Sequence, residues 1–315
     1  MTPSAGKVSG DCFGACKSGE KVYIKPGPIR KNELKNKQKR NAGMEPFIDT
    51  HAHLIGGVDW NLMEEIAASG VLKQAWLMHC PCVSDNIPFA DEDEVLECAR
   101  RYPGLFIPFG FIDFGKGPGE VERLRDKGFL GLKAISPLKP YNDESYFPVY
   151  AKAEELGMPV LFHVGIISKG FWKRMKTPGF PGPGNMKPSM LDTIADAFPK
   201  LQLIQGHQGV PWIDELYESL FYYPNIRCSV CGLIDYEWLI RNLDRRCSFG
   251  ETFSQRLMFG VDGLYGSRPH WQDIPDTAVF MDEFFTRVGR TYNWGASRRN
   301  FMSENAAALF AGIGG

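Results

Sequence analysis

From residue 46 onward, the sequence alternates between short apolar runs and longer runs with helical periodicity. The short runs are apolar almost throughout, as expected for strands of a parallel sheet that is covered on both faces. The runs between them place apolar residues three and four positions apart, which is the spacing of an amphipathic helix. This alternation constrains the fold more than any other feature, because it predicts consecutive βα units.

Eight such strand and helix pairs follow one another. The predicted strands are 46–54, 74–80, 105–113, 129–136, 159–165, 201–209, 226–234 and 256–263. The predicted helices are 61–70, 91–104, 119–128, 146–157, 189–199, 212–224, 236–246 and 277–289. Eight units in about 250 residues predict a (β/α)8 TIM barrel. A doubly wound open sheet is the alternative, but no glycine-rich dinucleotide motif follows the first strand.

Residues 1–45 lie outside this pattern and form a predicted N-terminal extension, with the barrel over 46–315. The segment is basic and is interrupted by Gly and Pro, so it cannot form a core alone. We expect an arm that packs on the barrel or reaches a neighbouring subunit of a homo-oligomer, most simply a dimer. Cys12 and Cys16 in this arm are either thiols of a flexible segment or groups with a metal or redox role.

Charge and hydropathy exclude several classes of protein. The formal net charge of −1 argues against nucleic-acid binding, which usually requires a strongly basic face. No apolar run approaches the roughly 20 residues of a membrane span, and the N-terminus lacks the apolar segment of a signal peptide. We therefore expect a soluble, cytoplasmic protein that binds neither nucleic acid nor a membrane.

The remaining cysteines are not expected to form disulfides, because a chain with so large a core does not need them. Cys228 and Cys231 form a C-x-x-C in the apolar run IRCSVCGLI. No second pair follows nearby to complete a zinc site. We therefore expect both thiols to lie in a buried strand.

Residues that bind metals stand at the carboxyl ends of the predicted strands, where the active sites of such barrels lie. The first strand ends in His51 and His53, which point to one side because they are two positions apart. The fifth strand ends in His163, the sixth in His207 and the eighth in Asp262. Each alone could be a buried hydrogen-bonding residue or a cap. Together they predict a catalytic metal site, best suited to Zn²⁺, with Mn²⁺, Fe²⁺ or cobalt also possible.

The loop over 166–188, after the fifth strand, is long enough to form a lid over this site. Cationic and aromatic residues on strand ends and loops are candidates for contact with a small, carboxylate-bearing substrate, although each could equally be an ordinary surface or packing residue. These candidates are Lys133, Trp172, Arg174, Tyr265 and Arg268.

Several segments resemble the amidohydrolase superfamily, namely FIDTHAHL, GLKAISP, YFPVYAKAEELGMPVLFHVG, LIQGHQG, LMFGVDG and SENAAALF. More narrowly, they resemble its amidohydrolase-related (amidohydrolase 2) branch, which contains decarboxylases of the aminocarboxymuconate-semialdehyde and resorcylate types beside many hydrolases. The resemblance covers about residues 46–310. It implies one divalent metal and a residue beside the water on that metal. The implied ligands are His51, His53, His163 and Asp262, and the residue beside the water is His207.

Three departures from the family pattern bear on the reaction. Lys133 ends the fourth strand, where some relatives in the wider superfamily carry a carboxylated lysine that bridges two metals, but in this branch the lysine usually does not bridge. His163 is followed by Val-Gly, which is closer to hydrolase-like relatives than the His-Pro often found in decarboxylases. Asp262 is followed by Gly-Leu-Tyr rather than the Tyr-Pro common in this branch, so the substrate pocket there is expected to differ.

The resemblance implies metal-dependent hydrolysis of an amide, a lactone or a related C–N or C–O bond. His207 and Asp262 would position or deprotonate a water whose pKa the metal lowers from near 16 toward about 7. The alternative is a metal-dependent non-oxidative decarboxylase of a hydroxyaromatic or muconate-type acid, which would use the same ligands. A non-catalytic, scaffolding role would predict a damaged site, whereas all five residues are present.

Overall fold

The computed structural model describes residues 45–81, 83–84, 87–167, 179–271, 273–292 and 297–310. The predicted arm therefore lies outside the described residues except for its last position.

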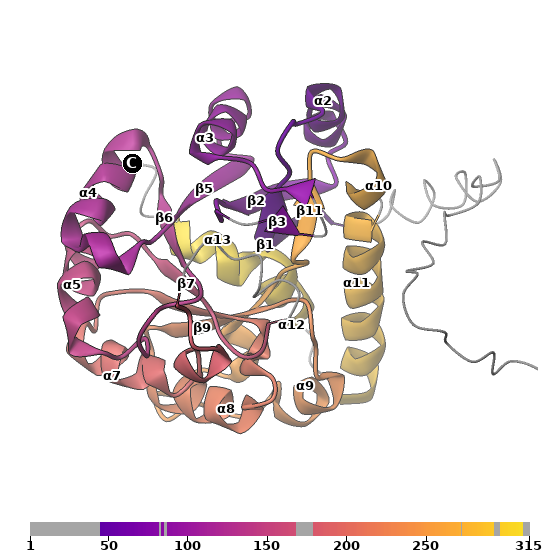
Figure 1. Cartoon of the computed structure of the whole chain (residues 1–315). Coiled ribbons are helices and arrows are strands. Elements are labelled where there is room, and N and C mark those ends of the chain that lie inside the picture. The colour runs from indigo at the N-terminus through magenta and orange to yellow at the C-terminus, as the bar shows by residue number, and fades with distance from the viewer. Residues whose placement is uncertain are drawn as a thin grey trace, which may run out of the picture. The chain divides into compact units, whose positions relative to one another are not determined.

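Within the described residues, nine strands form one sheet in which all neighbours are parallel (Figure 1). They follow the order of the sequence around the sheet, apart from the last strand, which lies beside the first. The strands are β1 (Phe47–Leu54), β2 (Leu72–Met78), β5 (Phe106–Phe111), β6 (Gly131–Ala134), β7 (Val160–His163), β8 (Leu203–Gly206), β9 (Ile226–Val230), β10 (Leu257–Phe259) and β11 (Gly263–Tyr265). Two further strands, β3 (Val83–Ser84) and β4 (Ile87–Pro88), pair with each other in antiparallel fashion.

The predicted eighth strand is divided into β10 and β11, and this division closes the ring. β10 pairs with β9, whereas β11 pairs with β1. Between them, the amide of Gly260 still donates to the carbonyl of Val230 over 3.1 Å. The amide of Asp262 then donates to the carbonyl of His51 over 2.7 Å. The last strand thus passes from one edge of the sheet to the other, which confirms the predicted TIM barrel.

A helix follows each strand at the predicted position, and Figure 1 shows these helices around the outside of the strands. The helices are α2 (Trp60–Ala68), α3 (Glu92–Arg101), α4 (Pro118–Lys127), α5 (Phe147–Glu155), α7 (Met190–Ala197), α8 (Ile213–Tyr222), α9 (Tyr236–Asn242) and α11 (Asp273–Tyr292). Within the described residues, no helix combines the length and the apolar character that crossing a membrane requires.

α3 shows how local sequence fixes a helix. The Asp91 side chain accepts from the amide of Glu94, and the Glu94 side chain accepts from the amide of Asp91, which makes a capping box. Acidic residues fill the first turn, and Arg100 and Arg101 stand in the last turn, as the helix dipole favours.

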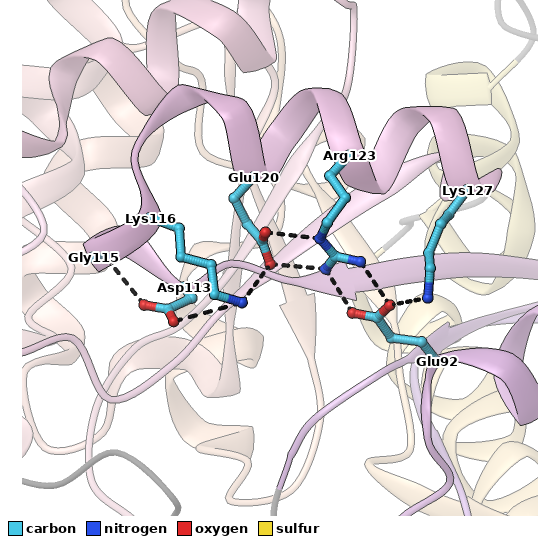
Figure 2. A network of polar contacts seen from close by, with 7 residues as sticks. All are labelled: Glu92, Asp113, Gly115, Lys116, Glu120, Arg123 and Lys127. Carbon is cyan, nitrogen blue, oxygen red and sulfur yellow. Dashed lines mark hydrogen bonds and ion pairs between the residues drawn. The ribbon is translucent and has the colours of Figure 1, made fainter.

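Ion pairs join α3 to α4, as Figure 2 shows. The Arg123 guanidinium makes two hydrogen bonds to Glu92 and two to Glu120, all at 2.7–2.8 Å. Lys127 adds a contact of 2.7 Å to Glu92. These hydrogen bonds with the Arg123 guanidinium hold the pKa of the Glu92 carboxyl down at about 2. The network therefore fastens two neighbouring helices on the outer surface of the barrel.

The core has two parts. The larger part fills the space between strands and helices, and the smaller part lies inside the barrel, around Ile48, Trp76 and Phe109. The short helix α13 (Asn305–Phe310) contributes Ala306 to the inner part. The Phe310 ring lies edge-on to Trp76, with centroids 5.2 Å apart. Because Ile48 precedes the histidines on β1, α13 covers the end of the barrel opposite to them.

The segment beyond α11 had no predicted elements. The structure adds α12 (Ser297–Arg299), the π-helical turn η6 (Asn300–Glu304) and α13 there, and α10 (Arg268–Trp271) before α11. Shorter 3₁₀ turns lie at η1 (Phe114–Lys116), η2 (Glu144–Tyr146), η3 (Pro183–Asn185), η4 (His207–Gly209) and η5 (Phe253–Gln255). These pieces are too short to give a periodic signal in the sequence.

Candidate metal centre

The two histidines of β1 lie next to each other at the carboxyl end of the strand. Their ring centroids are 5.5 Å apart. His51 is fully buried, whereas His53 is 7% exposed and stacks on Phe89 with centroids 4.7 Å apart. The alternation of side chains along an extended strand brings both imidazoles to the same side.

Asp262 faces both imidazoles from the break between β10 and β11. Its Oδ1 lies 3.4 Å from His53 Nε2 and 3.7 Å from His51 Nε2. Its backbone φ of 61° lies in the left-handed region, which turns the side chain away from the direction that a regular strand would give it. The three residues hold one ligand atom each within 4.8 Å of one another.

His163 and His207 reach the same place from β7 and η4. Their ring centroids are 4.2 Å apart, and His207 Nδ1 lies 3.9 Å from Asp262 Oδ2. His163 Nε2 lies 3.2 Å from the carbonyl oxygen of Ile166. The structure thus brings together the four histidines and the aspartate that the sequence analysis selected, with His163 directed at the backbone of the following loop.

The buried imidazoles are held in their neutral form. Burial lowers the pKa of His51 and of His163 well below the ordinary value, and it lowers the pKa of His207 to about 4. Burial opposes ionisation of Asp262, but the neighbouring His207 and His53 hold the pKa of its carboxyl below the ordinary value. Neutral imidazoles and a carboxylate are the forms that bind metals.

The donor atoms fit a divalent metal. His51 Nε2, His53 Nε2 and Asp262 Oδ1 face one another, and imidazole with carboxylate suits zinc, manganese or iron. His53 Nδ1 and His207 Nε2 are buried without a hydrogen-bond partner among the described residues. Such atoms are rare in native proteins, and a bound ion, water or substrate would satisfy them.

Lys133, at the end of β6, shares this centre. It is fully buried, and its Nζ lies 2.9 Å from His51 Nε2. This nitrogen of His51 also faces Asp262, so an ion bound there would displace the contact with Lys133. Lys133 also lines the cavity, and its contact with a carboxylate of the substrate stays a prediction.

Asp49, which was not among the predicted site residues, holds the backbone beside His51 and Asp262 in place. Its Oδ1 accepts hydrogen bonds from the amides of His51, at 3.1 Å, and Val261, at 2.9 Å. Its Oδ2 accepts from the hydroxyl of Tyr265 over 3.0 Å. Burial raises the pKa of this carboxyl to about 7. A register shift in the pairing of β1 with β2 between Asp49 and Ala52 interrupts the alternation of side chains, so counting back from His51 does not give the direction of the Asp49 side chain.

The prediction that Cys231 lies in a buried strand was wrong. Cys228 does belong to the larger apolar core, but Cys231 follows the end of β9 and faces the histidines. Its Sγ lies 3.1 Å from His51 Nδ1 and 3.5 Å from His207 Nδ1. Its position after the end of a barrel strand, which marked the histidines, could have identified it.

A cavity of about 500 Å³ opens above these residues. Its polar lining comes from the candidate centre, and the rest is mostly aliphatic. The described lining residues are His53, Phe89, Lys133, Ile135, His163, Ile166, Ile167, His207, Val210, Gly232, Leu233, Asp262 and Leu264. A small molecule can therefore place a polar group against the histidines and an apolar body against the opposite wall.

Two predicted substrate contacts need correction, and two cannot be placed. Tyr265 is fully buried and uses its hydroxyl for Asp49, so it does not line the cavity. Arg268 also lies outside the lining, because its guanidinium pairs with Glu65 at 2.7 Å and with Asp59 at 3.2 Å. Most of the predicted lid lies outside the described residues, together with Trp172 and Arg174.

Comparison with known proteins adds a family and a set of related folds. Residues 83–311 match the model of the family described as Amidohydrolase, a span that includes Lys133, His163, His207 and Asp262. None of the curated proteins matches the sequence.

Solved structures with a similar fold include three enzymes. A 5-carboxyvanillate decarboxylase from Sphingomonas paucimobilis is 14% identical, with 85% of this chain and 99% of that chain covered and a TM-score of 0.52. A probable 2-pyrone-4,6-dicarboxylic acid hydrolase from Acinetobacter baumannii is 13% identical, with the same coverage and a TM-score of 0.51. A manganese-bound 5-carboxyvanillate decarboxylase from Novosphingobium aromaticivorans is 19% identical, with 78% and 79% covered and a TM-score of 0.51. At these identities, the likeness shows the fold alone.

Proposed function

Because this chain belongs to the amidohydrolase family, we propose that it is a metal-dependent hydrolase of a small, carboxylate-bearing substrate with a C–N or C–O bond to be cleaved. One observation carries the proposal. His51, His53 and Asp262 hold their ligand atoms within 4.8 Å of one another beside a cavity that fits a small molecule.

His51, His53 and Asp262 would hold the ion, with His163 completing the set. When bound, a divalent ion supplies Lewis-acid polarisation of a carbonyl group and a water of lowered pKa. Zinc suits the imidazole and carboxylate ligands best. Manganese is second, because it is bound in the decarboxylase from Novosphingobium aromaticivorans.

The other residues of the site bind and orient the substrate. Lys133 brings a positive charge into a mostly aliphatic cavity, where it attracts a carboxylate more strongly than it would in water. Asp262 and His207, with Oδ2 and Nδ1 3.9 Å apart, are placed to accept and return a proton during hydrolysis. The side chains of Ile135, Ile166 and Leu233 give the cavity an apolar wall for the body of the substrate.

Non-oxidative decarboxylation of a hydroxyaromatic acid is the second candidate. The fold of two 5-carboxyvanillate decarboxylases favours it, as does a cavity wall of aliphatic side chains that would accommodate an aromatic ring. The same ligands would serve that reaction.

Product analysis tests the two candidates. The full-length protein, loaded with zinc or with manganese, is incubated with carboxylated amides, lactones and phenolic acids, and the products are identified by mass spectrometry. Addition of water supports the hydrolase, and loss of carbon dioxide supports the decarboxylase. In either case Asp262→Asn should abolish turnover. Turnover that persists in this variant would contradict the proposed site.

A further inference from the structure

Cys231 lies between two histidines of the centre. Its Sγ is 3.1 Å from His51 Nδ1 and 3.5 Å from His207 Nδ1, and the rings of the two histidines have centroids 4.7 Å apart. The residue is fully buried, and it belongs to neither part of the apolar core. A thiol has one weak donor and can act as a weak acceptor, so it can serve both imidazoles at once.

The contact with Lys133 decides the direction of these hydrogen bonds. A lysine ammonium only donates, so His51 Nε2, 2.9 Å from Lys133 Nζ, must accept. A neutral imidazole carries one proton, which for His51 must then be on Nδ1, and this N–H points at the sulfur. The thiol accepts there and has its own proton left for His207 Nδ1.

We propose that Cys231 is a positioning residue that fixes the tautomers of both histidines, accepting from His51 Nδ1–H and donating to His207 Nδ1. The tautomers themselves do not depend on the proposed function, but the roles given to them in ion and substrate binding rest on it. In His51, it leaves the lone pair of Nε2 directed at Asp262 and His53, where the ion would bind. In zinc sites, the ring nitrogen that does not bind the metal usually donates to a carboxylate or a carbonyl. In His51, this nitrogen donates to the sulfur of Cys231 instead.

The consequence for His207 concerns the substrate. With Nδ1 accepting from the thiol, the proton of the neutral ring is on Nε2. That atom is buried and has no hydrogen-bond partner among the described residues, in a ring that lines the cavity. In this tautomer His207 can donate a hydrogen bond from Nε2 to a substrate oxygen, and the Asp262 carboxylate is the group of this pair that first accepts a proton.

Gly232 makes the arrangement possible. Its φ of 64° turns the chain directly after Cys231, and a Cβ at this position would lie 3.0 Å from His207 Nδ1 and 3.5 Å from Asp262 Oδ2. A side chain here would push the imidazole away from the sulfur, so only glycine leaves room for the contact.

Nitrogen NMR of the histidine side chains, recorded on the metal-free full-length protein, tests the tautomers directly. We expect an Nδ1–H tautomer for His51 and an Nε2–H tautomer for His207 in wild type and in Cys231→Ser, whose hydroxyl can both accept and donate. In Cys231→Ala, we expect a mixture of tautomers for both histidines. Cys228→Ala is the matched control, because that buried thiol lies three residues earlier, on β9, and packs in the apolar core.

Zinc binding gives an independent measurement. We expect Cys231→Ala to bind zinc roughly 10- to 100-fold more weakly than wild type, the range found when a partner of a metal-binding histidine is removed, and Cys231→Ser to restore most of the affinity. If wild type binds no zinc, the proposed function fails, while the NMR spectra still decide the tautomers.

Three results would overturn the role of Cys231. The first is the opposite tautomer for either histidine in wild type, which needs no variant to fold. The second is unchanged tautomers and zinc affinity in a folded Cys231→Ala. The third is a thiolate-to-cobalt charge-transfer band in the cobalt-loaded protein that disappears in Cys231→Ser, because Cys231 would then bind the ion itself.

Discussion

The two ends of the barrel interior are built from the same strands but bury opposite kinds of side chain. At the amino end, Ile48, Trp76 and Phe109 pack against one another and against α13. At the carboxyl end, His51 and His53 are buried among other ionisable groups. β1 contributes to both ends, with only two residues between Ile48 and His51. The amino end therefore stabilises the fold, whereas the carboxyl end buries polar atoms that a bound ligand would satisfy.

Asp262→Asn should cause the largest loss of turnover, and it should leave the packing at the amino end of the barrel unchanged. We expect turnover to fall by about 10²- to 10⁴-fold, because the amide neither accepts a proton nor offers a charged ligand. The free energy of unfolding should change little. Turnover of the metal-loaded protein and urea unfolding of the metal-free protein measure the two quantities.

Asp192→Asn is the control for this substitution, since the Asp192 carboxylate contacts Ser219 on the outer helices. It should leave turnover unchanged. Equal losses in both variants would mean that Asp262 acts only through the fold.

Trp76→Ala, at the amino end, should instead lower stability and leave the site at the carboxyl end unchanged. Trp76 is fully buried and stacks on Phe109 with centroids 5.3 Å apart. Its truncation should lower the free energy of unfolding by about 3–5 kcal/mol. Zinc affinity of the folded fraction, measured by titration, should stay the same. A large loss of zinc affinity in folded protein would show that the two ends are coupled.

Gly232→Ala should moderately lower both the stability of the fold and turnover. A residue with a side chain at a positive φ destabilises the fold by about 1–3 kcal/mol. The added Cβ would also meet His207 Nδ1 at 3.0 Å, so turnover should fall as well. Gly250→Ala is the control, because its φ of 98° is also positive but its Cβ would meet nothing within 4 Å. Thermal unfolding and turnover should separate the two variants, and identical turnover would argue against crowding at His207.

The smallest effect should be that of Glu92, on the outer surface of the barrel, on the pH dependence of stability. The pKa of Glu92 is about 2 in the folded protein, below its ordinary value of 4.5. A lowered pKa stabilises the fold above about pH 4.5, and this contribution disappears as the pH falls toward 2. Urea unfolding at about pH 5 and about pH 3 should therefore show a smaller acid-induced loss in Glu92→Gln than in wild type. The exposed Glu237→Gln should behave like wild type, and a wild-type response from Glu92→Gln would contradict the prediction.

The sequence predicted most of the fold and part of the site. Each strand and helix of the barrel was signalled by its own periodicity, and the strand ends located the histidines. Tyr265 was misplaced because the left-handed φ of Asp262 interrupts the alternation of a strand, so counting positions no longer gives the direction of a side chain. Asp49 and Cys231 escaped for another reason. Their partners lie far away in the sequence, as with Asp49 and Val261, which are 212 positions apart.

The divided last strand has a consequence for the time at which the centre forms. Asp262 stands where the ring closes, between β10, which pairs with β9, and β11, which pairs with β1. A chain emerging from the ribosome exposes His51 and His53 early, but it cannot add the carboxylate until nearly the whole barrel has been synthesised. At this candidate site, affinity for an ion would therefore depend on completed folding, and a truncated chain would retain the histidines without the carboxylate.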